Sequence, residues 1–198
     1  MSRSAPTTPR ARAPSCVLYD RKRGSHGGGD VCAYPKMSCA CRMLLPKIAT
    51  WLEQLIRPER EGEMDKDTIF HGVSAPEICI ADYIERLALY SGVGAPELVL
   101  VVLYIRRLLK LHPRFPCSDR SIHRTLLTVL LITAKMHRDS PFSNKFYSVV
   151  GGIPPPELAR LERCMLRLLN YRLFVTVEEY ESEAMNWSVE AAVRATRD

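Results

Sequence analysis

Apolar residues recur along most of the chain at intervals of three and four, the spacing that predicts amphipathic helices. A first stretch of this kind covers residues 44–58, and a longer series begins near Pro76. No segment shows sustained alternation of apolar and polar residues or a hairpin turn signal. Since strands with one buried face alternate with a period of two, the pattern predicts an all-α fold.

Helix-starting and helix-ending residues divide the longer series into five helices. The third is expected to be capped by Ser118 or Asp119, and the fourth by Ser143. Two glycines, Gly151 and Gly152, break the fourth through a positive φ or a close approach of the backbone. The expected ranges lie near residues 80–91, 95–111, 119–139, 144–150 and 155–169, and a capping box at 176–179 predicts one more helix.

The third helix is expected to be buried by the others, and two charges lie on faces that are otherwise apolar. From residue 126 to 134 apolar side chains fall on almost every side of a helical wheel. Lys135 then follows Leu131 at helical spacing, on the same face. Glu162 lies about 40° round the fifth helix from Leu158, close to its apolar stripe. A lone charge in such a sector is costly to desolvate, so each is expected to have a partner.

A characteristic series of residues runs through the third helix and the two that follow it. In order, it reads Ala134-Lys135, Asp139, Asn144, Phe146-Tyr147, Val150-Gly151-Gly152-Ile153, Glu157-Leu158 and Leu161-Glu162. With this series the chain resembles a cyclin of the P/U, or phosphate-pathway, type from about Pro76 to Tyr180, and more loosely back to Leu44. The resemblance implies a single five-helix cyclin box with one flanking helix at each end. The eighteen residues after Tyr180 are too few for a second box.

The resemblance also implies a partner, a cyclin-dependent kinase, which the chain would bind and activate without being an enzyme itself. In cyclins, the lysine that ends the central helix and the glutamate of the fifth helix contact the kinase near its mobile regulatory helix. The predicted kinase-binding residues here are Lys135, Glu162, Asp139, Asn144, Leu131 and Leu158. Two alternatives stay open: Lys135 and Glu162 form an internal ion pair that only joins two helices, or Asp139 serves only a local turn.

One departure from the family pattern concerns the docking of kinase substrates. Many cyclins carry a Met-Arg-x-Ile-Leu patch on the first helix of the box. The corresponding stretch here reads Tyr83-Ile84-Glu85-Arg86-Leu87, so only the arginine and a following apolar residue match. Docking of substrates through this patch is therefore not expected.

Positive charge is concentrated at the N-terminus. Residues 1–43 hold eight Lys/Arg and two Asp/Glu, while residues 44–198 hold twenty of each sign. Proline, glycine and weak periodicity favour disorder in this basic tail. The expected plan is a disordered tail (1–43), an N-terminal helix (44–58), a linker (59–75), the cyclin box (76–180) and a C-terminal helix and tail (181–198). The N-terminal helix packs on the core, lies at the edge of the partner interface, or does both.

Other classes of function find little support in the sequence. The histidines belong to no catalytic motif, and no cofactor is indicated. Cys32, Cys39 and Cys41 with His26 match no common zinc site, so no metal is expected. The apolar runs are shorter than the roughly 20 residues that cross a bilayer, which argues against a membrane partner. Seven cysteines without a disulfide pattern favour a reducing, intracellular location, in the nucleus, the cytoplasm or both.

Two rivals to kinase activation share the cyclin fold. One is a transcription adaptor that binds DNA, and the other is a scaffold that activates no kinase. The neutral folded region argues against nucleic acid as a partner, because binding to phosphates relies on clustered Lys and Arg. Basic residues gathered on one face of the domain would favour the adaptor.

Overall fold

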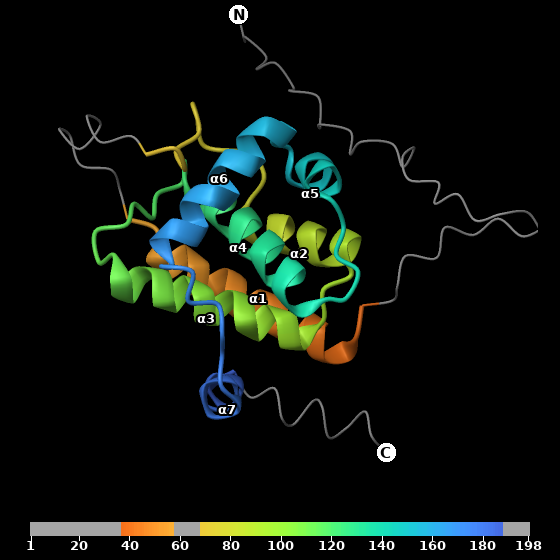
Figure 1. Ribbon diagram of the computed structural model, residues 1–198. Helices are drawn as coiled ribbons and strands as arrows, with labels where there is room; N and C mark the ends of the chain where they lie inside the picture. The colour runs from red at the N-terminus through yellow and green to blue at the C-terminus, as the bar shows by residue number, and fades with distance from the viewer. Residues whose placement is uncertain (1–36, 58–67, 188–198) are drawn as a thin grey trace, which may run out of the picture. The chain divides into compact units, whose positions relative to one another are not determined.

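Residues 37–57 and 68–187 are described by the computed structural model, and within these ranges the chain forms seven α-helices and no strand (Figure 1). The helices are α1 (Cys39–Leu55), α2 (Ile80–Ser91), α3 (Ala95–Leu111), α4 (Ile122–His137), α5 (Asn144–Gly151), α6 (Pro155–Leu168) and α7 (Val177–Asn186). The predicted all-α fold is confirmed. Among these helices none is both long and apolar enough to cross a membrane. Most of the predicted disordered tail, residues 1–36, lies outside the described ranges.

The other helices pack around α4. It contacts α2, α3, α5 and α6 (Figure 1), and every residue from 125 to 134 is buried. Its buried threonine hydroxyls donate to carbonyl oxygens four residues earlier, from Thr125 to Ser121, Thr128 to Arg124 and Thr133 to Val129. These bonds satisfy the hydroxyls inside the helix, so α4 can be surrounded by apolar side chains. The prediction of a buried third helix is correct.

An ionic cluster fixes the end of α4 against the start of α3. The backbone N–H of Gly94 donates to Oε2 of Glu97 at 2.9 Å, and Arg138 donates to Oε1 of the same carboxylate at 3.0 Å. Arg138 also donates to the carbonyl oxygens of Ser91 and Gly92 at the end of α2. The arginine thus joins three helix ends, and it determines where the last turn of α4 lies.

The two glycines that end α5 serve different purposes. Gly152 has φ +71°, the left-handed conformation in which a glycine ends a helix without steric strain. At Gly151 the constraint is space, because a Cβ atom would lie 2.2 Å from Cδ2 of Leu127. The carbonyl oxygen of Gly151 also accepts a hydrogen bond of 3.0 Å from the Tyr83 hydroxyl. Of the two reasons predicted for these glycines, positive φ applies to Gly152 and close approach of the backbone applies to Gly151.

Two helix starts differ from the predicted ones. α1 begins at Cys39 rather than residue 44, since the Ser38 hydroxyl accepts from the backbone N–H of Cys41 and caps the helix. For α4 the cap residue is Ser121, not Ser118 or Asp119. The Ser121 hydroxyl accepts from the N–H of Ser118 at 2.9 Å, so residues 118–121 form a turn before the helix.

α1 and the residues just before α2 belong to the core. Ile48 and Leu52 of α1 are fully buried, and the helix packs on α2 and α3. Part of the predicted linker, residues 68–75, is described, and there Phe70 is 1% exposed and packs edge-on against Phe115. The linker assignment is wrong for this part, because the aromatic ring of Phe70 anchors it.

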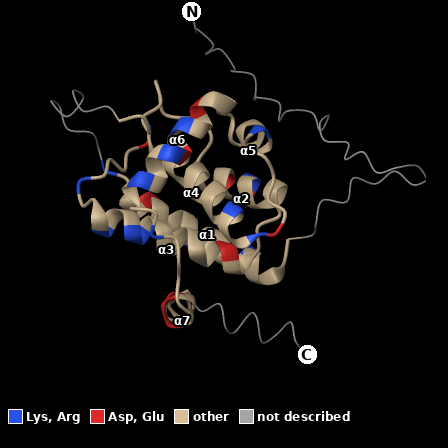
Figure 2. Ribbon diagram, in the orientation of Figure 1, with Lys and Arg blue, Asp and Glu red and all other residues tan. Residues whose placement is uncertain are grey.

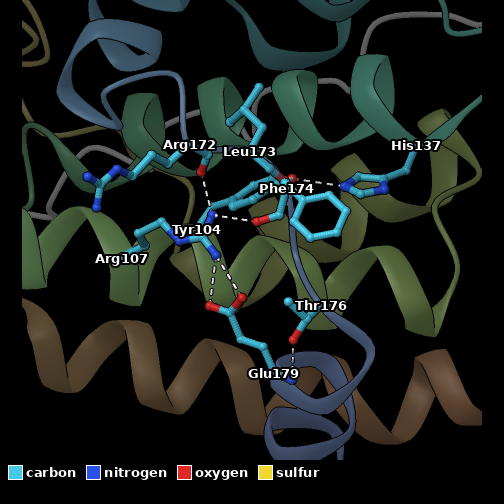
Figure 3. Close-up of polar contacts among 8 residues, drawn as sticks. All are labelled: Tyr104, Arg107, His137, Arg172, Leu173, Phe174, Thr176 and Glu179. Atoms are coloured by element: carbon cyan, nitrogen blue, oxygen red, sulfur yellow. Dashed lines mark hydrogen bonds and ion pairs between the residues drawn. The ribbon is translucent and has the colours of Figure 1, made fainter.

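Arg107 of α3 holds the segment between α6 and α7 (Figure 3). Its guanidinium donates to the carbonyl oxygens of Arg172 and Phe174. It also forms a two-point ion pair with Glu179 of α7, at 2.7 and 2.9 Å. One side chain therefore fixes both the connecting segment and the helix that follows it.

Tyr104, one turn before Arg107, links the same segment to the end of α4 (Figure 3). Its hydroxyl donates to the carbonyl oxygen of Leu173 at 2.6 Å and lies 2.8 Å from Nε2 of His137. Thr176 then caps α7, as its hydroxyl accepts from the backbone N–H of Glu179 at 3.2 Å. The predicted C-terminal helix is present.

We expect Gly151→Ala to lower the free energy of unfolding by about 1–3 kcal/mol, because the new methyl group would displace the buried Leu127 side chain. Urea denaturation followed by circular dichroism measures this loss. In a Leu127→Ala background the same substitution should cost clearly less. An equal loss in both backgrounds would contradict the close-approach explanation.

A second prediction concerns His123 of α4, a residue that is 9% exposed and whose Nε2 lies 2.9 Å from the Ile78 carbonyl oxygen. Burial lowers the pKa of His123 below its usual value of about 6.5. The unfolded chain therefore takes up a proton at higher pH than the folded chain does, and stability should fall as the pH drops below about 6.5. Urea midpoints between pH 7.5 and 5.5 should show a shallower decline for His123→Gln; an unchanged slope would contradict this.

Candidate functional site

The structure brings Lys135, Asn144 and Glu162 together at the surface. Nζ of Lys135 lies 2.6 Å from Oε1 of Glu162, and Nδ2 of Asn144 donates to Oε2 of Glu162 at 2.8 Å. The lysine and glutamate side chains are 35% and 15% exposed. α4, α5 and α6 each contribute one residue, so this Lys135–Asn144–Glu162 cluster exists only when the three helices pack.

Local structure explains the position of each of the three side chains. Lys135 lies in the last turn of α4, where the helix dipole favours a positive charge. Asn144 is the first residue of α5, directly after the Ser143 cap. Glu162 lies at the edge of the buried face of α6. Each is a residue type that the backbone tolerates or favours at its position.

Two residues of the predicted binding set lie beneath this surface. Leu131 and Leu158 are fully buried, one turn before Lys135 and Glu162 respectively. Assigning them direct contact with a partner is wrong, because core packing leaves no part of either side chain accessible. They hold the helices that carry the two charges.

The acceptor atoms of Glu162 are all used in the cluster, and the hydrogen-bonding capacity of Lys135 is used only in part. Both carboxylate oxygens of Glu162 are engaged, one by Lys135 and one by Asn144. Within the described part of the chain, by contrast, the Lys135 ammonium group donates to a single acceptor, although it has three N–H donors. Chemically, the cluster offers oriented donors to a carbonyl or carboxylate group of another molecule.

Large apolar side chains flank the cluster. Met136, next to Lys135, is 50% exposed, and Phe142 in the loop before α5 is 36% exposed. Phe142 stacks on Phe146 with ring centroids 4.1 Å apart, whereas Tyr147 is fully buried. Exposed apolar groups beside a polar cluster are typical of protein interfaces. The sequence pattern did not identify Met136 and Phe142, because residues at a helix end or in a loop have no periodicity to reveal their exposure.

Asp139 stays outside the cluster. It is exposed in the loop between α4 and α5, and within the described ranges its carboxylate forms no hydrogen bond or ion pair with Lys135, Asn144 or Glu162. Contact between Asp139 and a partner stays a prediction.

Of the cysteines considered for zinc, the two in the described ranges, Cys39 and Cys41, are not grouped with other metal ligands. Across the described residues no group of three or more His, Cys, Asp or Glu is placed to hold a metal ion. Cys41 is buried with its Sγ atom 3.7 Å from the Val93 carbonyl oxygen, and burial raises the pKa of its thiol to about 11. Cys39 is exposed, while Cys32 and His26 lie outside the described ranges.

On α2 the family's substrate-docking position has no apolar surface. Tyr83, Ile84 and Leu87 are all buried against the core, and Asp82 and Glu85 face solvent. That substrates do not dock through this stretch stays a prediction.

Comparison with known proteins places this geometry in context. A family model described as Cyclin matches residues 47–173, a range that starts inside α1 and includes all three cluster residues. Cyclin-P3-1 of Oryza sativa subsp. japonica is 34% identical over 160 residues, which cover 81% of this chain and 66% of the relative. Cyclin-U1-1 of Arabidopsis thaliana is 38% identical over 113 residues, which cover 57% of this chain and 54% of the relative.

Another relative carries a name that does not include the word cyclin. The Nuc-1 negative regulatory protein preg of Neurospora crassa is 32% identical over 140 residues, covering 68% of this chain and 29% of that protein. The chain thus spans between about a third and two-thirds of the length of these three relatives.

We expect Lys135→Ala to lower the free energy of unfolding by no more than about 1 kcal/mol, because the Lys135 side chain is 35% exposed and water screens the ion pair from that side. Glu162→Gln should behave similarly, since its amide oxygen can still accept from Asn144. Urea denaturation of both single variants and the double variant measures the coupling, with exposed Lys145→Ala as the control. A loss above about 2 kcal/mol would mean that the pair serves chiefly to join α4 to α6.

Proposed function

The chain belongs to the cyclin family, with P- and U-type cyclins among its relatives, and on this basis we propose that it binds and activates a cyclin-dependent serine/threonine kinase. The observation that carries the proposal is the Lys135–Asn144–Glu162 cluster with exposed Met136 beside it. The protein itself would be a regulatory subunit without catalytic activity.

The proposed mechanism acts on the movable regulatory helix of the kinase. Protein kinases transfer phosphate only when a glutamate on this helix pairs with the lysine that orients ATP. The free donors of Lys135 would bond backbone carbonyl groups at one end of the helix, and Met136 would cover apolar side chains along it. A surface that holds the helix inward in this way shifts the kinase towards its active state.

The internal ion pair supports this mechanism rather than competing with it. Glu162 and Asn144 restrict where the long Lys135 side chain can point. A side chain already held in place loses less conformational entropy when a partner binds. The pair would therefore preorganise the lysine for the kinase.

Of the rival functions, the DNA-binding adaptor gains no support from the distribution of charge. Lys and Arg residues occur on each helix from α1 to α6, and Figure 2 shows them spread over several helices. An intracellular place of action, in the nucleus, the cytoplasm or both, belongs to the same proposal.

Charge exchange separates the two possible roles of the ion pair. In Lys135→Glu/Glu162→Lys the internal attraction survives, so stability should stay within about 1 kcal/mol of wild type. Kinase recovery in a pull-down, and histone phosphorylation by the recovered complex, should fall at least about tenfold, because a carboxylate now faces acceptors on the kinase.

Controls make this result specific. Lys110→Ala and Glu85→Ala remove exposed charges on α3 and α2 and should leave kinase recovery unchanged. Full recovery and activity with the exchanged pair would reduce the Lys135–Glu162 pair to a link between helices. Recovery of an inactive kinase would favour the scaffold.

A further inference from the structure

The solvent-facing side of α6 carries three arginines and no acidic residue. Arg160, Arg163 and Arg167 are exposed, and their spacing of three and four places them on one stripe about 10 Å long. Figure 2 shows blue positions along the length of this helix. We call these three side chains the α6 arginine stripe.

Four other arginines of the described domain form ion pairs that join parts of the fold, and the arginines of the stripe do not. Arginine–glutamate pairs join Arg106 to Glu183, Arg107 to Glu179, Arg124 to Glu157 and Arg138 to Glu97. Within the described part of the chain the three α6 arginines form no such pair. Like charges three and four residues apart weaken a helix, so folding alone does not favour the stripe.

A pocket of about 220 Å³ opens at the N-terminal end of the stripe. Arg160 lines it together with Ile69, His71, Arg124, Glu157 and Leu161. Nη1 of Arg124 is held by Oε1 of Glu157 at 2.5 Å and by the Ile69 carbonyl oxygen at 3.3 Å. The single carboxylate of the lining is thus balanced by Arg124, and Arg160 leaves the pocket positively charged. Guanidinium groups recognise phosphate through two parallel N–H donors.

We propose that the pocket and the α6 arginine stripe bind an acidic protein segment that carries a phosphoserine or phosphothreonine. The phosphate enters the pocket between Arg160 and Arg124, and the acidic residues that follow it lie along Arg163 and Arg167. A stripe about 10 Å long fits an extended peptide of several residues better than a single small ion.

The position of the stripe allows both partners to bind at once. At 100° per residue the three arginines lie roughly 100–160° round α6 from Glu162. The phosphorylated segment would therefore occupy a side of α6 next to the proposed kinase surface rather than on it. This step rests on the proposed function: in a kinase-activating subunit, such a site retains substrates that have already been phosphorylated once.

Fluorescence anisotropy with the full chain and no kinase tests the site independently of kinase activation. The probe is fluorescein-labelled Gly-Ser-Gly-pThr-Glu-Asp-Glu-Glu-Gly, and its unphosphorylated form is the reference. We expect the phosphopeptide to bind at least about tenfold more tightly than the reference, and more weakly as salt is raised from about 0.05 to 0.2 M. Arg160→Gln/Arg163→Gln/Arg167→Gln should weaken binding of the phosphopeptide at least about tenfold.

A matched variant removes three exposed positive charges elsewhere, Arg42→Gln/Lys110→Gln/Arg114→Gln, and should bind the phosphopeptide like wild type. Equal weakening by both triple variants would overturn the proposal, as would equal binding of the two peptides. Single-stranded DNA that binds as tightly as the phosphopeptide, with the same loss in the α6 variant, would mark a general polyanion surface instead.

The chain's own acidic segment is the other possible occupant. Residues 58–67 carry five acidic and two basic side chains and directly precede Thr68. If the phosphopeptide binds only after Glu59, Glu61, Glu63, Asp65 and Asp67 are changed to their amides, the stripe serves this segment, and its assignment to a partner is overturned. If the wild-type chain recovers the kinase normally but does not bind the phosphopeptide, the stripe proposal is refuted and the proposed kinase activation is not.

Discussion

The other helices take their positions from α4, which is buried on all sides. A helix without a polar face has to satisfy its own polar groups, and its threonines do so through bonds to the preceding turn. Its neighbours can then approach closely, to the point that α5 meets Leu127 at a glycine. Charge enters this helix only at its ends, so Lys135 emerges at the surface where α4 leaves the core.

The ends of helices, rather than their middles, determine where the functional groups lie. Arg138 binds the carbonyl groups that end α2 and the glutamate that starts α3, and this fixes the last turn of α4. Arg107 does the same for the segment that leads to α7. Each arginine engages several acceptors at once, which is the geometry in which ion pairs contribute most to stability.

These contacts divide the charged side chains into two groups: those that join helices, and those that keep hydrogen-bond donors for another molecule. Four arginine–glutamate pairs join α3 to α7, α4 to α6 and the end of α4 to α3, whereas Lys135 and the α6 arginine stripe keep donors that the described fold does not use. The two proposed surfaces are built from these remaining donors. They lie on neighbouring sides of α6, because Glu162 and the arginines share one helix.

The candidate site was only partly predictable. The apolar surroundings of Lys135 and Glu162 indicated that each charge required a partner, and the family pattern added Asn144; all three meet at one carboxylate. Leu131 and Leu158 carried the same helical spacing, yet they lie wholly in the core. Spacing identifies a face of a helix but not how deeply each residue on that face is buried.

The helical class, the order and approximate limits of the helices, and the need for two charges to be compensated could all be predicted from the amino-acid pattern. Periodicity and capping residues act within one helix, so they can be read locally. The packing of the helices was needed to establish that α1 and Phe70 belong to the core, that Met136 is exposed, and that the α6 arginines lie beside a pocket. These features arise where segments distant in sequence meet, and such contacts leave no trace in the local pattern.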